Sequence, residues 1–123
     1  MADLEKAIAA KRTIAKAKFT RLLKSLKQSL DDNLPEKTIR SRYEAFQSAW
    51  DDVQAKHDEL MQTLIEPADI EQQDVWIDNV GCEYFSIKGR VNKHLENMEQ
   101  TKLNVIEAKR QKELEEERAR IKS

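Results

Sequence analysis

The chain has 123 residues, of which 22 are Lys or Arg and 23 are Asp or Glu, so its formal net charge is -1. Its two Gly, two Pro and one Cys exclude turn-rich all-β folds, which need a turn about every ten residues, and also a disulfide framework or a Cys-based zinc module. No run without a charged residue is longer than six residues, as in Leu60 to Ile65, which is too short to span a membrane. A lone cysteine fits a reducing compartment, so we expect one helical, cytoplasmic domain.

The first predicted helix covers residues 3–30 and is strongly basic. Its apolar side chains recur three, four or seven residues apart, as an amphipathic helix requires, at Ile8, Ala15, Phe19, Leu22, Leu26 and Leu30. Arg12 lies in this stripe where an apolar residue is expected. Residues 1–30 carry eight Lys or Arg and two acids, and no carboxylate lies between Lys6 and Lys27. We expect this helix to attract acidic helices of its own chain, phosphates or anionic lipid.

The second predicted helix covers residues 35–65. Its stripe alternates steps of four and three residues, and its members are Ile39, Tyr43, Phe46, Trp50, Val53, His57, Leu60 and Leu64. Asn33 or Leu34 is expected to cap the helix, with Pro35 in the first turn, where a missing N–H costs nothing. Residues 31–66 carry four basic and nine acidic side chains. This segment can therefore pair with the basic first helix.

The third predicted helix covers residues 69–106 and has the longest stripe. Asp69 with Gln72 three residues later is typical of a capping box. The stripe consists of Ile77, Val80, Tyr84, Ile87, Val91, His94, Met98, Thr101, Val105 and Ala108. Gly81 and Gly89 lie inside this helix, where each lowers helix stability by about 1 kcal/mol relative to Ala. Either they allow a neighbouring helix to approach closely or the helix kinks there.

Stripes of this period are unstable when they face water, and short connections place consecutive helices antiparallel. The sequence therefore predicts an all-α, elongated antiparallel three-helix bundle, coiled-coil-like, over residues 1–106. Residues 107–123 contain eleven charged side chains, with opposite charges three and four apart that favour a helix. We expect them to form a charged helical extension or linker.

No pattern of catalytic residues is apparent, so we expect no enzyme activity, no metal or other cofactor and no small-molecule substrate. His57 and His94 fall at seam positions of antiparallel helices, and Cys82 lies twelve residues before His94. This spacing is not that of a metal site, and satisfied core histidines are the favoured interpretation. A histidine buried in its neutral form predicts a bundle that weakens near pH 5.

The basic first helix leaves non-specific nucleic-acid or anion binding open. The candidate residues are Lys11, Arg12, Lys16, Lys18, Arg21, Lys24 and Lys27. Phe19 is the only aromatic residue of this helix and lies on the core stripe, so base-specific RNA recognition is not expected. The favoured interpretation is that the charge solvates the helix and pairs with the acidic second helix.

Three segments resemble a known family when they are taken in order. They are residues 10–23 (AKRTIAKAKFTRLL), residues 46–60 (FQSAWDDVQAKHDEL) and residues 83–91 (EYFSIKGRV), the last preceded by residues 74–77 (DVWI). Together they resemble the amino-terminal Gag-like region of BEL/Pao-type LTR retrotransposon polyproteins. The resemblance implies a structural role in a polyprotein whose Gag part assembles into virus-like particles around RNA. A CCHC knuckle is missing, since there is a single Cys.

The expected function is accordingly that of a Gag-like structural protein that works by self-association into a homo-oligomer. The third helix carries more apolar side chains than one seam needs, and the candidate self-association residues are Trp76, Phe85, Leu95, Leu103 and Ile106. Two alternatives stay open. One is non-specific RNA binding through the basic first helix, and the other is a spectrin-like adaptor or scaffold bundle.

Overall fold

The computed structural model describes residues 2–122, which form three helices and no strand. Helix α1 spans Ala2–Asp31, α2 spans Glu36–Met61 and α3 spans Pro67–Lys122. The predicted all-α three-helix bundle is confirmed. Helix α2 ends four residues before its predicted end, whereas α3 starts two residues early and continues as one helix through the predicted extension. Met1 and Ser123, the end residues of the predicted ranges, lie outside the described residues.

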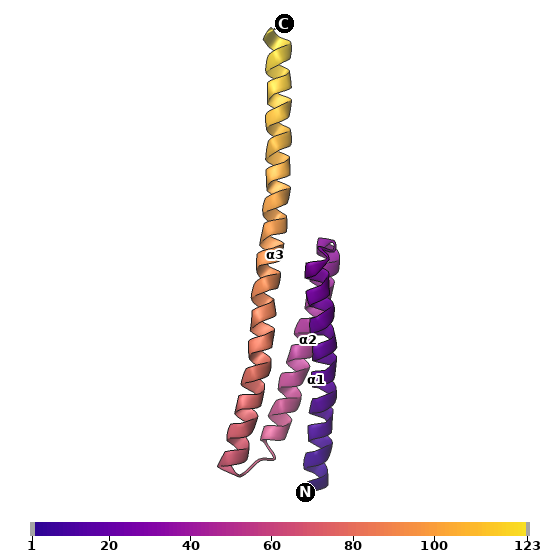
Figure 1. The fold of residues 1–123 in the computed structure, drawn as a ribbon, viewed down its shortest axis with the longest axis vertical. Coiled ribbons are helices and arrows are strands. Elements are labelled where there is room, and N and C mark those ends of the chain that lie inside the picture. The colour runs from indigo at the N-terminus through magenta and orange to yellow at the C-terminus, as the bar shows by residue number, and fades with distance from the viewer. Residues whose placement is uncertain (1, 123) are drawn as a thin grey trace. The chain divides into compact units, whose positions relative to one another are not determined.

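The chain runs along α1, returns along α2 and reverses again into α3 (Figure 1). Contacts between rings give the directions, because Phe19 in the middle of α1 meets Phe46 and Trp50 of α2. Near the start of α1, Arg12 reaches His57 at the far end of α2. Helices α1 and α2 are therefore antiparallel.

Four aromatic residues form the centre of the bundle. Phe19 and Phe46 lie with ring centroids 4.8 Å apart, and Trp50 stacks on Tyr84 of α3 at 5.1 Å. All four side chains are buried. Offset ring contacts at these distances add about 0.5–1.5 kcal/mol each beyond the burial of apolar area, so this cluster fixes the mutual position of all three helices.

The two glycines of α3 have different surroundings. A Cβ placed on Gly81 would lie 3.6 Å from the Trp50 ring, whereas a Cβ on Gly89 would meet nothing within 4 Å. Gly81 is buried and Gly89 is exposed. Of the two predicted roles, close approach of a neighbouring helix therefore applies to Gly81, and α3 continues through both positions.

The connection between α1 and α2 corrects one expectation. Asn33 is the only non-glycine residue with a positive φ among the described residues, at 49°, and its N–H donates to the Leu30 carbonyl while the Leu34 N–H donates to the Ser29 carbonyl. These are the two hydrogen bonds of a Schellman motif, in which Asn tolerates the left-handed conformation. Asn33 therefore ends α1, and Pro35 is the N-cap of α2 without a side-chain hydrogen bond.

The chain divides into two compact units after Val91. We call residues 2–91 the bundle and residues 92–122 the terminal segment. Burial in α3 extends through Val80, Tyr84 and Ile87 and includes Leu95, but every residue from Glu99 to Lys122 is exposed. The predicted stripe is thus exposed from Thr101 onward. Helices α1 and α2 have 30 and 26 residues, and α3 has 56.

Candidate functional site

The seven basic candidates of α1 fall into two groups. Arg12 and Lys16 are half-buried and contact α3, whereas the other five are exposed. We call these five the basic surface, and they are Lys11, Lys18, Arg21, Lys24 and Lys27. At about 100° per residue, Lys18, Arg21 and Lys24 point away from Phe19, and Lys11 and Lys27 lie on the two flanks of α1. All five are exposed and therefore available to a partner.

Arg12 is the centre of a cluster that joins the three helices of the bundle. Its Nη1 donates to Oε1 of Gln73 at 2.7 Å and to Nδ1 of His57 at 3.1 Å. The guanidinium carbon lies 4.0 Å from the centroid of the Trp76 ring, within the range of a cation–π interaction. Arg12 therefore has a packing role. Its place in an apolar stripe was the signal in the sequence, but its three partners could not be identified from spacing alone.

His57 is held in one tautomer by this cluster. Arg12 has only donors, so Nδ1 of His57 accepts, and a proton of the neutral ring must lie on Nε2. The ring also stacks on Trp76, with centroids 5.7 Å apart. Burial and then the Arg12 charge lower the pKa of His57 below 6.5, while Asp58 and Asp74 act in the opposite direction. Protonation would replace the hydrogen bond from Arg12 with repulsion between two cations.

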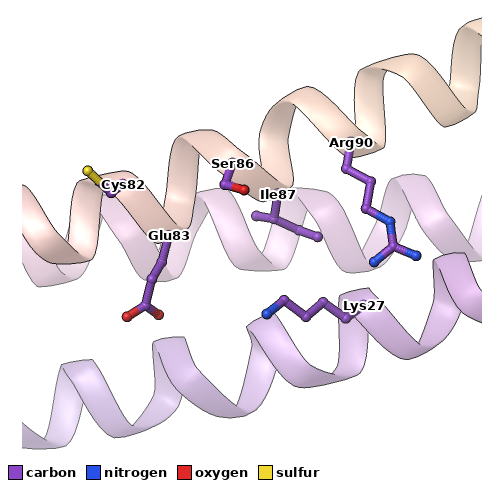
Figure 2. Close-up of a pocket in the computed structure, with 6 residues that line it drawn as sticks. All are labelled: Lys27, Cys82, Glu83, Ser86, Ile87 and Arg90. Carbon is purple, nitrogen blue, oxygen red and sulfur yellow. The ribbon is translucent and has the colours of Figure 1, made fainter.

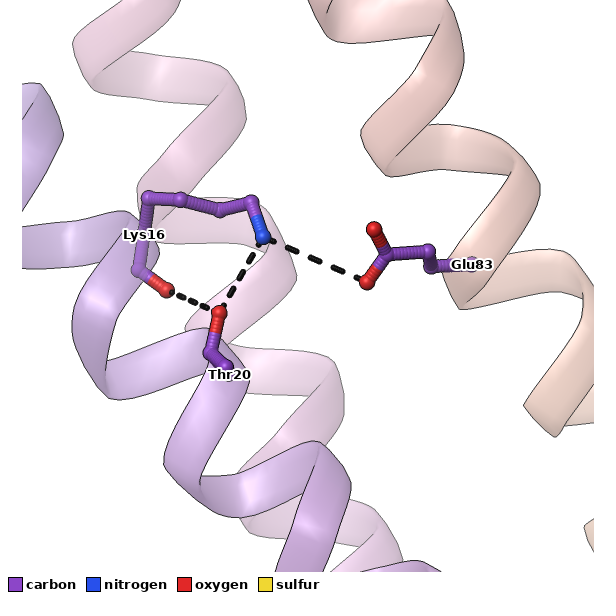
Figure 3. Close-up of polar contacts among 3 residues, drawn as sticks. All are labelled: Lys16, Thr20 and Glu83. Atoms are coloured by element: carbon purple, nitrogen blue, oxygen red, sulfur yellow. Dashed lines mark hydrogen bonds and ion pairs between the residues drawn. The ribbon is translucent and has the colours of Figure 1, made fainter.

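Lys16 links α1 to α3 through a weaker set of contacts (Figure 3). Its Nζ lies 4.0 Å from Oε2 of Glu83 and donates to Oγ1 of Thr20 at 3.1 Å. The Thr20 hydroxyl in turn donates to the Lys16 carbonyl at 3.0 Å. An ion pair as exposed as this one contributes at most about 1 kcal/mol. Lys16 therefore adds little to the stability of the bundle.

A surface depression of about 560 Å³ lies between α1 and α3 of the bundle. Figure 2 shows Glu83 and Arg90 extending from α3 toward α1, where Lys27 lies. Cys82, Ser86 and Ile87 complete the lining. Glu83 pairs with Lys16, and Arg90 donates to a carboxylate oxygen of Asp31. Glu83 and Arg90 are thus each paired with a residue of α1.

The five predicted self-association residues are placed differently. Trp76 is half-buried within the Arg12 cluster, and Leu95 is buried. Phe85, Leu103 and Ile106 are exposed. Only these three can meet a partner without a rearrangement of the chain.

The terminal segment exposes a series of large apolar side chains. Their exposed fractions range from 43% to 79%. We call them the association surface, and they are Leu103, Val105, Ile106, Leu114 and Ile121. Val105, Leu114 and Ile121 were not among the self-association candidates. Val105 was assigned to the core stripe, and the charged residues around Leu114 and Ile121 obscured their periodicity. Charge along this segment alternates in blocks, since residues 102–112 carry four basic and one acidic side chain and residues 113–117 carry four Glu.

Two further classes of site are not found in the described residues. No three or more His, Cys, Asp or Glu side chains of residues 2–122 are grouped to hold a metal ion. No helix in the same range combines the length and apolar character needed to cross a membrane.

Comparison with known proteins identified no relative of this chain. No protein-family model matches the chain, and searches of the curated proteins and of the solved structures also returned no match.

Proposed function

We propose that this chain is a structural module that assembles by self-association through its association surface. The observation that carries the proposal is that residues 99–122 form helix with every side chain exposed, five large apolar ones included. In proteins, most of the stability of a helix comes from packing of its apolar face. A second helix would supply that packing.

The amino-acid composition of the terminal segment favours pairing with another helix over binding of a small molecule. The terminal segment presents apolar side chains interspersed with charges of both signs along one helix. Apolar positions bury area against a partner helix, and flanking charges select which helix and which orientation. This type of surface is typical of coiled-coil assembly.

The resemblance to the amino-terminal Gag-like region of BEL/Pao-type retrotransposon polyproteins agrees with such a role. A Gag-like protein works by associating with copies of itself, and the proposed role in virus-like particle formation rests on that resemblance alone. Self-association is the part of the proposal that the geometry supports.

Sedimentation equilibrium of the full chain over a range of concentrations tests the proposal. We expect the mass to rise from 14.4 kDa toward twice that value as the concentration increases. Leu103→Ser combined with Leu114→Ser should hold the protein near the mass of one chain, because both changes place hydroxyls in the apolar contact.

Phe85→Ser is the matched control, since Phe85 is also an exposed apolar residue but lies in the bundle. It should leave the association unchanged. A wild-type chain that stays at 14.4 kDa at the highest concentration would refute the proposal.

A second candidate function is non-specific binding of single-stranded RNA by the basic surface. It is favoured by five exposed cations on one helix, with no carboxylate from Lys6 to Lys27. If all five contact phosphates, the logarithm of the binding constant should fall with the logarithm of the salt concentration at a slope of roughly -3.5.

A titration with single-stranded RNA at low and moderate salt tests this second function. Combined reversal of Lys18, Arg21 and Lys24 to Glu should abolish binding, whereas reversal of the exposed Lys37 on α2 should have little effect. Absence of binding by the wild-type chain at low salt would remove this candidate.

A further inference from the structure

The exposed residues of the terminal segment contain a continuous heptad seam. Steps of four and three residues join Leu103, Glu107, Arg110, Leu114, Glu117 and Ile121, all of them exposed. Residues at this spacing line one side of a helix. The seam thus has three apolar and three charged members, and the charged ones decide how two copies can pair.

Parallel pairing of two copies in register places each seam residue opposite itself. Leu103 then meets Leu103, but Glu107 meets Glu107 and Arg110 meets Arg110, with like charges at close range. Such juxtapositions are destabilising and are a common means of excluding a wrong orientation. Parallel in-register pairing therefore brings together like charges at three of the six seam positions.

Antiparallel pairing offers a register that matches every central position. When Leu103 of one copy lies opposite Leu114 of the other, Glu107 lies opposite Arg110. Two-fold symmetry repeats both layers. Shifting the copies by one heptad so that Leu103 meets Ile121 instead places Glu107 opposite Glu117. One oxygen of Glu107 accepts a hydrogen bond from Gln111 at 3.4 Å, and a carboxylate can accept several more.

We infer that the partner of the terminal segment is a second copy of this chain, bound antiparallel, with Leu103 packed against Leu114 and Glu107 paired with Arg110. The inference rests on the proposed function, and it adds the orientation and the register. The two-fold axis passes between residues 108 and 109, so the contact is centred within the terminal segment.

Disulfide trapping in a Cys82→Ser background distinguishes the orientations. In the antiparallel register, Leu103→Cys and Leu114→Cys form a disulfide only when the two variants are mixed. In each variant alone, the equivalent cysteines lie eleven positions apart, or about 16 Å along the helix, which is beyond the reach of a disulfide. Parallel pairing gives the opposite result, with each variant forming a disulfide by itself.

A charge exchange tests the same inference without changing the apolar layers. Glu107→Arg alone and Arg110→Glu alone should each raise the dissociation constant about tenfold, and the chain that carries both changes should recover the wild-type value. If the single variants bind as tightly as wild type, the register is wrong.

The outcomes separate the inference from the proposed function. Dimers seen by sedimentation, combined with disulfides in the single-cysteine variants, would overturn the antiparallel register and retain self-association. Monomers at all concentrations, with no disulfide in any mixture, would overturn both.

Discussion

The two halves of α3 carry apolar residues at the same helical spacing, but only one half is covered. In the bundle, Val80, Tyr84 and Ile87 are buried, whereas Leu103, Leu114 and their neighbours in the terminal segment are exposed. In the bundle, the Phe46 and Trp50 rings of α2 stack on the Tyr84 ring. Periodicity therefore indicates which face of a helix is apolar. Whether that face is buried depends on whether another helix of the same chain packs against it.

The largest contrast is expected between two phenylalanines. Phe46 is 0% exposed and contacts Phe19 and Tyr84, whereas Phe85 is 60% exposed. Phe46→Ala should lower the free energy of unfolding by about 3–5 kcal/mol, and Phe85→Ala should change it by less than about 0.5 kcal/mol. Urea denaturation followed by circular dichroism measures both. Equal losses would mean that the aromatic cluster does not hold the bundle together.

The next contrast is between two basic residues of α1. Arg12→Ala removes the cation–π contact with Trp76 and leaves His57 and Gln73 without their donor, so we expect a loss of about 1–3 kcal/mol. Lys18→Ala changes an exposed residue of the basic surface and should be nearly neutral. If the two variants unfold at the same urea concentration, the Arg12 cluster does not stabilise the bundle.

Replacement of the two glycines of α3 should have opposite effects on stability. Gly89→Ala is expected to stabilise the protein by about 1 kcal/mol, because alanine favours the helix and a Cβ there meets nothing within 4 Å. Gly81→Leu should destabilise it, since the larger side chain must displace the Trp50 ring. Thermal unfolding of both variants provides the measurement, and a lower melting temperature for Gly89→Ala would contradict the first expectation.

A smaller effect is expected from pH, because a single ring is involved. The lowered pKa of His57 means that the unfolded chain takes up the proton more readily than the folded chain. Stability is therefore complete above about pH 6.5 and declines as the pH falls through 6.5 toward the folded pKa. The charged groups that act on the pKa of His57 are Arg12 on α1, which lowers it, and Asp58 on α2 and Asp74 on α3, which raise it. Between pH 7.5 and 5.5, the melting temperature should fall further for wild type than for His57→Leu, and equal falls would show that His57 is not responsible.

The seam positions explain how far the fold could be predicted. Six of the eight predicted members of the α2 stripe are buried, because alternating steps of four and three residues leave a helix only one face to bury. The α1–α2 connection was less predictable. Asn33 suits either the start of one helix or the end of the preceding one, and only its positive φ shows which role it has.

The candidate surfaces were harder to predict than the helices. Whether a lysine or arginine of α1 stays exposed depends on what α3 places beside it, as the Gln73–Trp76 pair does for Arg12. Burial in α3 ends before Glu99, although the predicted apolar stripe continues beyond that position, so spacing alone did not indicate where burial stops. The sequence showed that α3 has more apolar residues than one seam needs. Which of them are exposed, as Phe85, Leu103 and Ile106 are, is known only from the structure.

The difference between the bundle and the terminal segment is tested most directly by amide hydrogen exchange of the full chain at low and high protein concentration. Amide exchange reports local opening of the helix. Association with a second copy slows exchange only in the segment that forms the contact. Protection of residues 103–114 should increase with concentration, while protection around Phe46 and Tyr84 stays constant. Protection of residues 103–114 that is the same at both concentrations would contradict pairing with a second copy.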